Sequence, residues 1–293
     1  MTKSERNALI ALPVILIVAA GLAAAGSQTS AVVFGLPLYA ISVGLAFLIQ
    51  WIVFVPSYIN RTEHFFDLTG SITYITVATA AVILSPEKDA RTYLLLALVV
   101  IWAARLGTFL FMRVRKAGAD NRFDEIKVSF LRFLLTWTLQ GLWVSFSLAG
   151  ALVAITSAEK EPLGLFALAG FLVWLVGFGI EAAADAQKNR FRANPENKGK
   201  FISSGLWAWS RHPNYFGEIT LWVGVLIIAL PILKGWGWVA LISPIFITLL
   251  LTRISGVPML ERRADEKWGG QPDYEAYKAR TPVLVPLPPR QSS

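Results

Sequence analysis

The sequence predicts an all-α integral membrane protein, a polytopic bundle of about eight transmembrane helices. Of its 293 residues, 55% are hydrophobic and only 16% are charged, whereas about 25% of the residues in soluble domains are charged. Eight apolar runs approach the ~20 residues that a helix needs to cross a bilayer. They lie at about 8–26, 36–56, 69–84, 91–112, 128–156, 162–184, 214–233 and 236–254. Alternating strands of about ten residues are absent, which argues against a β-barrel.

Two of these runs leave alternatives open. The run at 69–84 is short and rich in Thr, so a bundle of seven spans is the alternative. The first run follows Lys3 and Arg6 and has three alanines at its end, as a secretory signal peptide would. Because it is long and further spans follow, we expect a retained first helix.

The distribution of Lys and Arg orients the bundle. Cytoplasmic loops of membrane proteins are enriched in these residues, and here the basic segments are 113–127, 185–213 and the tail after Arg253. The first of them contains Arg113, Arg115, Lys116, Arg122 and Lys127. Eight spans then place both termini and all three basic segments in the cytoplasm, and we expect the inner membrane of a bacterium.

One membrane domain is predicted at 1–257, followed by a cytoplasmic tail at 258–293 with a small helix at Asp273–Ala279. The net charge of +8 follows from the basic loops, and without a basic-aromatic module we expect no nucleic acid partner. The absence of cysteine excludes disulfides, thiol nucleophiles and iron–sulfur clusters. Two histidines argue against a multi-histidine metal site, so no metal is expected. No Gly-rich strand–turn–helix is present for a Rossmann fingerprint or a P-loop.

The segment from Asp185 to Glu218 is charged, although apolar runs flank it. It ends in His212-Pro213-Asn214, where Pro suits the first position of a helix. The N-terminus of a helix has free N–H groups and a positive dipole end, which favour an anion. With cationic side chains beside it, a phosphate-bearing ligand at the membrane face is the first hypothesis.

Several charged residues fall inside or at the ends of the predicted spans, where charges are expensive and usually functional. Arg105 lies two turns inside its span, roughly 11 Å, which is far for snorkelling to the interface. Glu181, Asp185, Glu218 and Arg253 lie nearer the ends of theirs. One interpretation is that they pair with one another. The other is a cavity open to the cytoplasm and lined by Arg105, Asp185, Arg192, Arg211, Asn214, Glu218 and Arg253, in which Arg forks bind phosphates.

Other polar and aromatic residues have two interpretations each. Gln140 in mid-span suits either a hydrogen bond to a neighbouring helix or a ligand contact. The cluster of Glu63, His64, Asp67 and Tyr74 suits either helix packing beside a loop or a proton donor. An interfacial aromatic belt accounts for Trp207 and Trp209, and for Trp236 and Trp238 at the opposite interface.

The stretch GLWAWSRHPNYFGE at 205–218 resembles the signature of the bacterial domain-of-unknown-function 1295 family. That family is similar to the C-terminal half of steroid 5-alpha-reductases, which are multi-span helical proteins that bind NADPH in a cytoplasmic cavity. The wider superfamily includes the sterol C14 and C7 reductases and, more distantly, the isoprenylcysteine carboxyl methyltransferases. The resemblance covers about residues 100–286.

The reductase pattern is present without a gap as Asp185, Arg192, Gly205-Leu206 and Asn214 to Glu218. The resemblance implies that Asp185, Arg192, Asn214 and Glu218 contact the cofactor. Arg105, Leu139-Gln140-Gly141, Arg253 and the tail from Tyr277 also resemble reductase positions. The full predicted cofactor set is Arg105, Asp185, Arg192, Arg211, His212, Asn214, Tyr215, Glu218, Arg253 and Tyr277.

The sequence departs from the steroid reductases at the substrate-binding pair. Those enzymes use a Glu on an early helix and a Tyr three residues before the Arg that Arg105 matches. Here that second position is Trp102, and the early helix around 54–57 has no carboxylate. The substrate therefore stays open, and Tyr74 or Glu63 is the hypothesis for the acid.

Three functions follow as hypotheses. The first is a reductase that passes a hydride from NADPH to a C=C bond of a lipophilic steroid-like or isoprenoid-like substrate from the bilayer. The surplus of Arg and Lys favours NADPH over NADH. The second is an S-adenosylmethionine-dependent methyltransferase, because Arg211-x-Pro-x-Tyr-x-Gly and Tyr274-x-x-Tyr277 match the isoprenylcysteine enzymes. The third is a non-enzymatic protein that binds membrane lipids. In each case we expect a monomer.

Overall fold

The structure is a computed structural model that describes residues 1–117 and 123–288, with side chains for 1–112 and 123–288. The side chains of Arg113, Arg115 and Lys116, and the whole of Arg122, lie outside this description. The chain forms two compact units. The first comprises Met1–Ala167 and Ile228–Ser243, and the second comprises Leu168–Ile227 and Pro244–Ser293.

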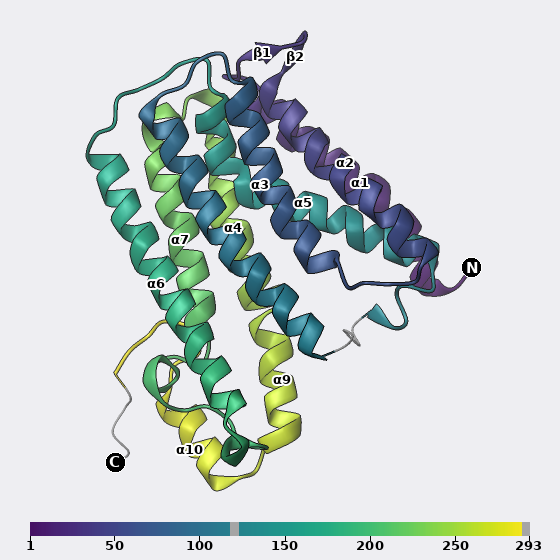
Figure 1. The fold of residues 1–293 in the computed structure, drawn as a ribbon, viewed down its shortest axis with the longest axis vertical. Coiled ribbons are helices and arrows are strands. Elements are labelled where there is room, and N and C mark those ends of the chain that lie inside the picture. The colour runs from purple at the N-terminus through teal and green to yellow at the C-terminus, as the bar shows by residue number, and fades with distance from the viewer. Residues whose placement is uncertain (118–122, 289–293) are drawn as a thin grey trace. The chain divides into compact units, whose positions relative to one another are not determined.

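The first unit is a bundle of long apolar helices (Figure 1). Its elements are α1 (Lys3–Gly26), the strands β1 (Val32–Val33) and β2 (Leu36–Pro37), α2 (Leu38–Ile59), α3 (Phe66–Leu84), α4 (Ala90–Ala117), α5 (Phe130–Thr156), and the 3₁₀ turns η4 (Leu230–Ile232) and η5 (Gly235–Leu241). A capping box starts α1, because Glu5 N donates to Thr2 Oγ1 and Thr2 N donates to a Glu5 carboxylate oxygen.

Polar side chains inside this unit bind neighbouring helices. Gln50 of α2 donates from Nε2 to Thr73 Oγ1 of α3 at 2.8 Å, and Gln140 of α5 donates from Nε2 to the Phe66 carbonyl at 3.2 Å. Interhelical hydrogen bonds of this kind hold helices together where lipid offers no partner. Of the two interpretations of Gln140, helix packing is therefore the one that the structure supports.

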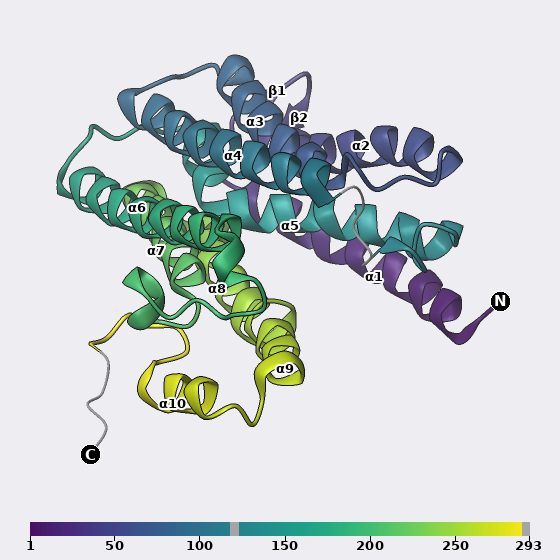
Figure 2. The same cartoon turned by 60° about the horizontal axis from the view of Figure 1, so that its bottom comes forward.

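The second unit contains most of α6 (Leu165–Ala193) and α7 (Pro213–Ala229), and then a series of shorter elements. These are the 3₁₀ turns η2 (Pro195–Asn197) and η3 (Gly205–Ala208), α8 (Ile242–Leu249), the π turn η6 (Leu250–Ile254), α9 (Val257–Trp268) and α10 (Pro272–Arg280). Figure 2 shows α9 and α10 as separate short helices after α8. The predicted helix start at Pro213 is confirmed, and the small helix predicted at Asp273–Ala279 is α10. The sequence did not predict α9.

Glycines hold α6 and α7 against each other, side by side in Figure 1. A Cβ on Gly217 would lie 2.6 Å from the Gly177 carbonyl oxygen, and a Cβ on Gly177 would lie 2.5 Å from Leu221 N. Gly224 meets the Gly170 carbonyl in the same way, at 2.6 Å. The two backbones are thus in direct contact, as small residues allow between membrane helices, and this contact fixes the start of α7.

In the described part of the chain, eight helices are long and apolar enough to cross a membrane. They run from Lys3–Gly26 to the continuous stretch Gly235–Trp268. The predicted spans at 8–26, 69–84 and 214–233 each lie in a separate helix of this set, and so do the other five. The prediction of a polytopic helical membrane protein is confirmed, and the alternative of seven spans is not supported.

Candidate functional site: a basic pocket in the second unit

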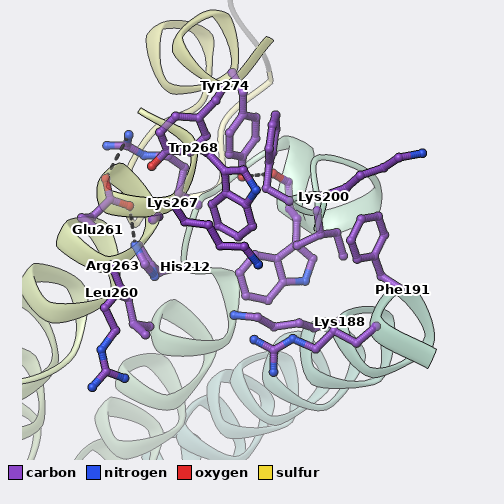
Figure 3. A pocket seen from close by; sticks show the side chains of 17 residues that line it. Lys188, Phe191, Lys200, His212, Leu260, Glu261, Arg263, Lys267, Trp268 and Tyr274 are labelled. Atoms are coloured by element: carbon purple, nitrogen blue, oxygen red, sulfur yellow. Dashed lines mark hydrogen bonds and ion pairs between the residues drawn. The ribbon is translucent and has the colours of Figure 1, made fainter. Parts of the chain in front are cut away.

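A cavity of about 330 Å³ lies within the second unit, between the end of α6, the segment 200–212, α9 and α10 (Figure 3). Its cationic lining residues are Lys188, Arg192, Lys200, Arg211, Arg263 and Lys267. Its aromatic lining residues are Phe191, Phe201, Trp207, Trp268, Tyr274 and Tyr277, with His212 beside them. Glu261 is the one acidic residue that lines this cavity. The pocket therefore combines a large positive excess with flat apolar faces.

The C-terminal half of α6 holds the floor of the pocket. Trp207 donates from Nε1 to the Ala184 carbonyl at 3.0 Å, and Leu206 N donates to Gln187 Oε1 at 2.9 Å. The Lys188 ammonium lies 4.2 Å from the centre of the Trp207 ring, a cation–π contact. Trp207 is only 3% exposed, so interpreting it as an exposed belt residue was wrong. Trp209 is exposed, as a belt residue would be.

Glu261 of α9 binds the two residues that precede α7. Its carboxylate oxygens lie 3.1 Å from an Arg211 Nη and 2.8 Å from His212 Nε2. His212 is buried, and its ring stacks on Tyr215 with centres 5.6 Å apart and an angle of 9° between planes. One carboxylate thus fixes the orientation of both Arg211 and His212.

An aromatic wall closes the side of the pocket formed by α9 and α10. Trp268 donates from Nε1 to the Gly199 carbonyl at 2.6 Å, and Phe201 packs against the rings of Trp268 and Tyr277. Tyr277 donates its hydroxyl to the Trp207 carbonyl at 2.7 Å. Burial raises the pKa of Tyr277 above its ordinary value, so this phenol stays protonated and keeps its hydrogen bond.

The segment that follows α10 lies along the loop that precedes α7. Arg211 N donates to the Pro282 carbonyl at 2.9 Å, and Ser210 Oγ donates to the Leu284 carbonyl at 2.7 Å. Leu287 N donates to the Trp209 carbonyl at 3.0 Å. These three bonds therefore hold the loop 209–211 against the segment 282–287 that follows α10.

The structure gathers part of the predicted cofactor set. Arg192, Arg211, His212 and Tyr277 line the pocket, and Tyr215 contacts it through the ring of His212. Other predicted residues belong to the same unit without lining the cavity. Asp185 is buried near the end of α6, Asn214 and Glu218 are half-buried in the first turns of α7, and Arg253 is exposed in η6. Arg105 lies on α4 in the first unit and is half-buried.

The two predicted acids lie in the first unit with different surroundings. Tyr74 of α3 is buried and meets Trp102 of α4 edge to face, with ring centres 5.0 Å apart. Glu63 is 4% exposed and accepts a hydrogen bond from Lys127 Nζ at 2.8 Å. The bond to Glu63, with a second to Asp124 at 3.0 Å, raises the pKa of Lys127 above its ordinary value. Glu63 is thus one half of an ion pair.

Sequence reasoning did not single out Glu261, Lys267, Trp268 or Arg263. All four lie on α9, a polar helix that begins directly after the last apolar run. A signal was available, because apolar residues at Val257, Leu260, Ala264 and Trp268 follow helical spacing among charged residues.

Residues 53–281 identify the protein family to which this sequence is similar. Over this range, which is most of the chain, the sequence matches the family described as "Protein of unknown function (DUF1295)". The chain belongs to this family. The resemblance noted at 205–218 is thereby confirmed.

Curated relatives match shorter stretches of this chain than the family comparison does. The "Probable O-methyltransferase ustE" of Ustilaginoidea virens is 37% identical over 84 residues, 27% of this chain and 29% of the relative. The "Delta(14)-sterol reductase ERG24A" of Gibberella zeae is 33% identical over 92 residues, 26% of this chain and 19% of the relative. The "Steroid 5-alpha-reductase DET2" of Gossypium hirsutum is 29% identical over 132 residues, 44% of this chain and 46% of the relative.

In each case the chain spans less than half the length of the relative. No solved structure is significantly similar to it.

Proposed function

We propose that this integral membrane protein is an NADPH-dependent reductase of a C=C bond in a lipophilic, steroid-like or isoprenoid-like substrate. The observation that carries the proposal is the pocket of the second unit, where six cationic residues face one carboxylate. The guanidinium forks of Arg and the ammonium groups of Lys both suit phosphates. The number of cations favours NADPH, with its additional phosphate, over NADH.

The residues present fit a dinucleotide. Among the residues that the structure describes, Lys200 and Arg263 make no ion pair with a carboxylate, so their charges are available to phosphate groups. The aromatic wall offers flat faces to a ring, as Trp268 and Phe201 do. When bound, NADPH would supply the hydride. The role of this chain is to bind and orient it and to exclude water.

Arg211 is the residue best prepared for a phosphate. Its guanidinium is held by Glu261, and its backbone N–H is used by Pro282. A cation with a fixed position loses little side-chain freedom on binding, which strengthens each charge-assisted hydrogen bond. For Asp185, Asn214 and Glu218, which do not line the cavity, contact with the sugar or amide groups of the cofactor remains part of the proposal.

The acid that completes the reduction is proposed from the first unit. Glu63 is held by Lys127 at 2.8 Å, so its carboxylate already takes part in an ion pair. Of the two candidates, Tyr74 is therefore favoured over Glu63 as the group that polarises a substrate carbonyl.

The named reductases among the relatives support a reductase, and the apolar spans support a substrate that enters from the bilayer. The proposal includes the cytoplasmic membrane of a bacterium, a monomer, and both termini and the pocket on the cytoplasmic side. It also includes a membrane bundle at 1–257 and a cytoplasmic tail at 258–293. The change to polar sequence at the start of α9 supports that boundary.

A methyltransferase is the second candidate, because the relative named as a probable O-methyltransferase matches with 37% identity. Its methyl donor would be S-adenosylmethionine, which carries a sulfonium cation and no phosphate. A pocket with six cations repels such a donor where it attracts a dinucleotide phosphate. Electrostatics therefore favours the reductase.

The test is ligand-dependent thermal unfolding of the protein purified in mild detergent. A ligand that binds only the folded protein stabilises it, by about 2.7 kcal/mol at a hundredfold excess over Kd. We expect the largest stabilisation with NADPH, less with NADH and none with S-adenosylmethionine. Stabilisation by S-adenosylmethionine without any by NADPH would overturn the reductase. No stabilisation by any of the three would favour the non-enzymatic lipid-binding alternative.

A further inference from the structure

The hairpin between α1 and α2 has a backbone that its sequence does not favour. Strands β1 and β2 pair antiparallel, with Val33 opposite Leu36, and Phe34 and Gly35 form the turn. Both turn residues have positive φ, 55° and 78°. Asn-Gly or Asp-Gly is usual in a turn of this hand, and a bulky residue at positive φ is an outlier. Outliers of this kind point to a function for the side chain that they present.

The tip that this turn presents is apolar and exposed. Phe34 is 84% exposed, Val32 65% and Leu36 59%. No charged residue occurs from Gly26 to Asn60. Contiguous apolar groups of this kind are unfavourable in water and mark a surface that contacts a partner or a membrane.

The hairpin is held firmly in place. Ala31 N donates to the Thr156 carbonyl at the end of α5 at 2.8 Å, and Leu38 N donates to the Ala31 carbonyl at 2.8 Å. Tyr39 N donates to Ser30 Oγ at 3.0 Å. Because these bonds join the hairpin to α2 and α5, the direction in which Phe34 projects is set by the bundle.

We propose that the hairpin tip, Val32 to Leu36, inserts into the lipid of the bilayer interface. The exposed apolar surface continues from the hairpin onto the flanking helices, where Ile17 of α1 is 71% exposed and Ile52 of α2 is 61% exposed. At the same end of the unit, Trp236 N bonds Gln28 Oε1 at 2.6 Å. The Trp236 side chain is 69% exposed, and exposed Trp is typical of membrane interfaces.

The chain contains no cysteine, so single-cysteine variants take one spin label each in the full-length protein reconstituted in phosphatidylcholine vesicles. Val32→Cys reports on the hairpin and leaves Phe34 in place. Ile17→Cys is the lipid reference. Glu87→Cys is the aqueous reference at the same end, because Ser85 Oγ bonds both the Glu87 carbonyl and the Ile155 carbonyl of α5. The readout is accessibility to dissolved oxygen relative to a water-soluble nickel chelate.

We expect the label at 32 to resemble Ile17→Cys, with high accessibility to oxygen and low accessibility to nickel. Adding Phe34→Asp, which suits a positive φ, is expected to shift it toward the Glu87→Cys values without lowering the unfolding temperature in detergent. Values like those of Glu87→Cys in the parent would overturn the proposal. Shielding from both reagents, as by a protein partner or a second copy, would overturn it too. An unchanged label in the Phe34→Asp variant would do the same.

Discussion

The two units differ in what they do with charge. In the first unit, the buried Glu63 has Lys127 within 2.8 Å, and the buried Arg91 donates to the Glu161 and Pro162 carbonyls. In the pocket of the second unit, six cationic residues surround one carboxylate. Buried charges that serve only the fold are paired within it. The cationic side chains that line the pocket suit the anionic ligand that we propose.

The largest effect is expected where a pair of the first unit is broken. Lys127→Met removes the ammonium that lies 2.8 Å from the buried Glu63 carboxylate, which should destabilise the protein by about 3 kcal/mol. The pKa of Lys127 lies above its ordinary value of 10.5 because of Glu63. The stabilisation by the pair is therefore present below pH 10.5 and is lost at more alkaline pH. Unfolding monitored by Trp fluorescence in detergent measures both.

A double variant separates lost charge from lost packing. Adding Glu63→Gln to Lys127→Met also removes the buried negative charge, so most of the stability should return. If the double variant is as unstable as the single one, the pair does not act through charge.

In the second unit, backbone contact between α6 and α7 should be the most sensitive structural feature. Gly217→Ala places a Cβ 2.6 Å from the Gly177 carbonyl oxygen, and overpacking of this kind costs about 2 kcal/mol. Gly179→Ala is the matched control. Gly179 lies on α6, and nothing lies within 4 Å of its Cβ position. That variant should gain up to about 1 kcal/mol. Equal unfolding temperatures for the two variants would contradict the close contact.

Removing one cation of the pocket tests whether its charge serves a ligand or the fold. Arg211→Ala should weaken NADPH binding about tenfold, since a hydrogen bond to a charged group contributes about 1.5 kcal/mol. Arg190→Ala is the control, because Arg190 is exposed on the same helix as Arg192 and does not line the cavity. Calorimetric titration distinguishes the two, and a similar loss in both would mean general attraction by a basic surface.

The smallest effect is expected at the aromatic wall. Tyr277→Phe removes the donor to the buried Trp207 carbonyl, which should destabilise the second unit by about 1 kcal/mol. Tyr274→Phe removes a hydroxyl that binds Asp265, an exposed residue, so its effect should be smaller. If Tyr274→Phe lowered the unfolding temperature more than Tyr277→Phe did, the hydrogen bond from Tyr277 to Trp207 would not be what stabilises the pocket.

The sequence predicted what depends on local composition. Apolar runs close to the length that a helix needs to cross a bilayer predicted the eight helices, and Pro213 predicted the start of α7. The motif at 205–218 led to Arg211 and His212 because they lie in it. Glu261 was not found, although it binds both, because it is 49 residues from His212 in sequence and no spacing rule connects them.

Trp207 and Glu63 are two further residues whose partners could not be predicted from the sequence. Composition makes Trp207 a plausible interface residue, and only the fold shows its indole bound to the Ala184 carbonyl. Glu63 has the residue type of a proton donor, and its partner Lys127 is 64 residues away. Residue type predicts what a side chain can do. The partners that decide whether it does so come from long-range packing.

The central claim is that the basic pocket binds NADPH, and calorimetric titration of the purified parent protein with NADPH tests it most directly. The parent should bind NADPH more tightly than NADH. An Arg192→Ala/Arg211→Ala variant, with an unfolding temperature close to that of the parent, should have lost at least tenfold in affinity. Equal affinity in the parent and the folded double variant, or no binding by the parent, would contradict the claim.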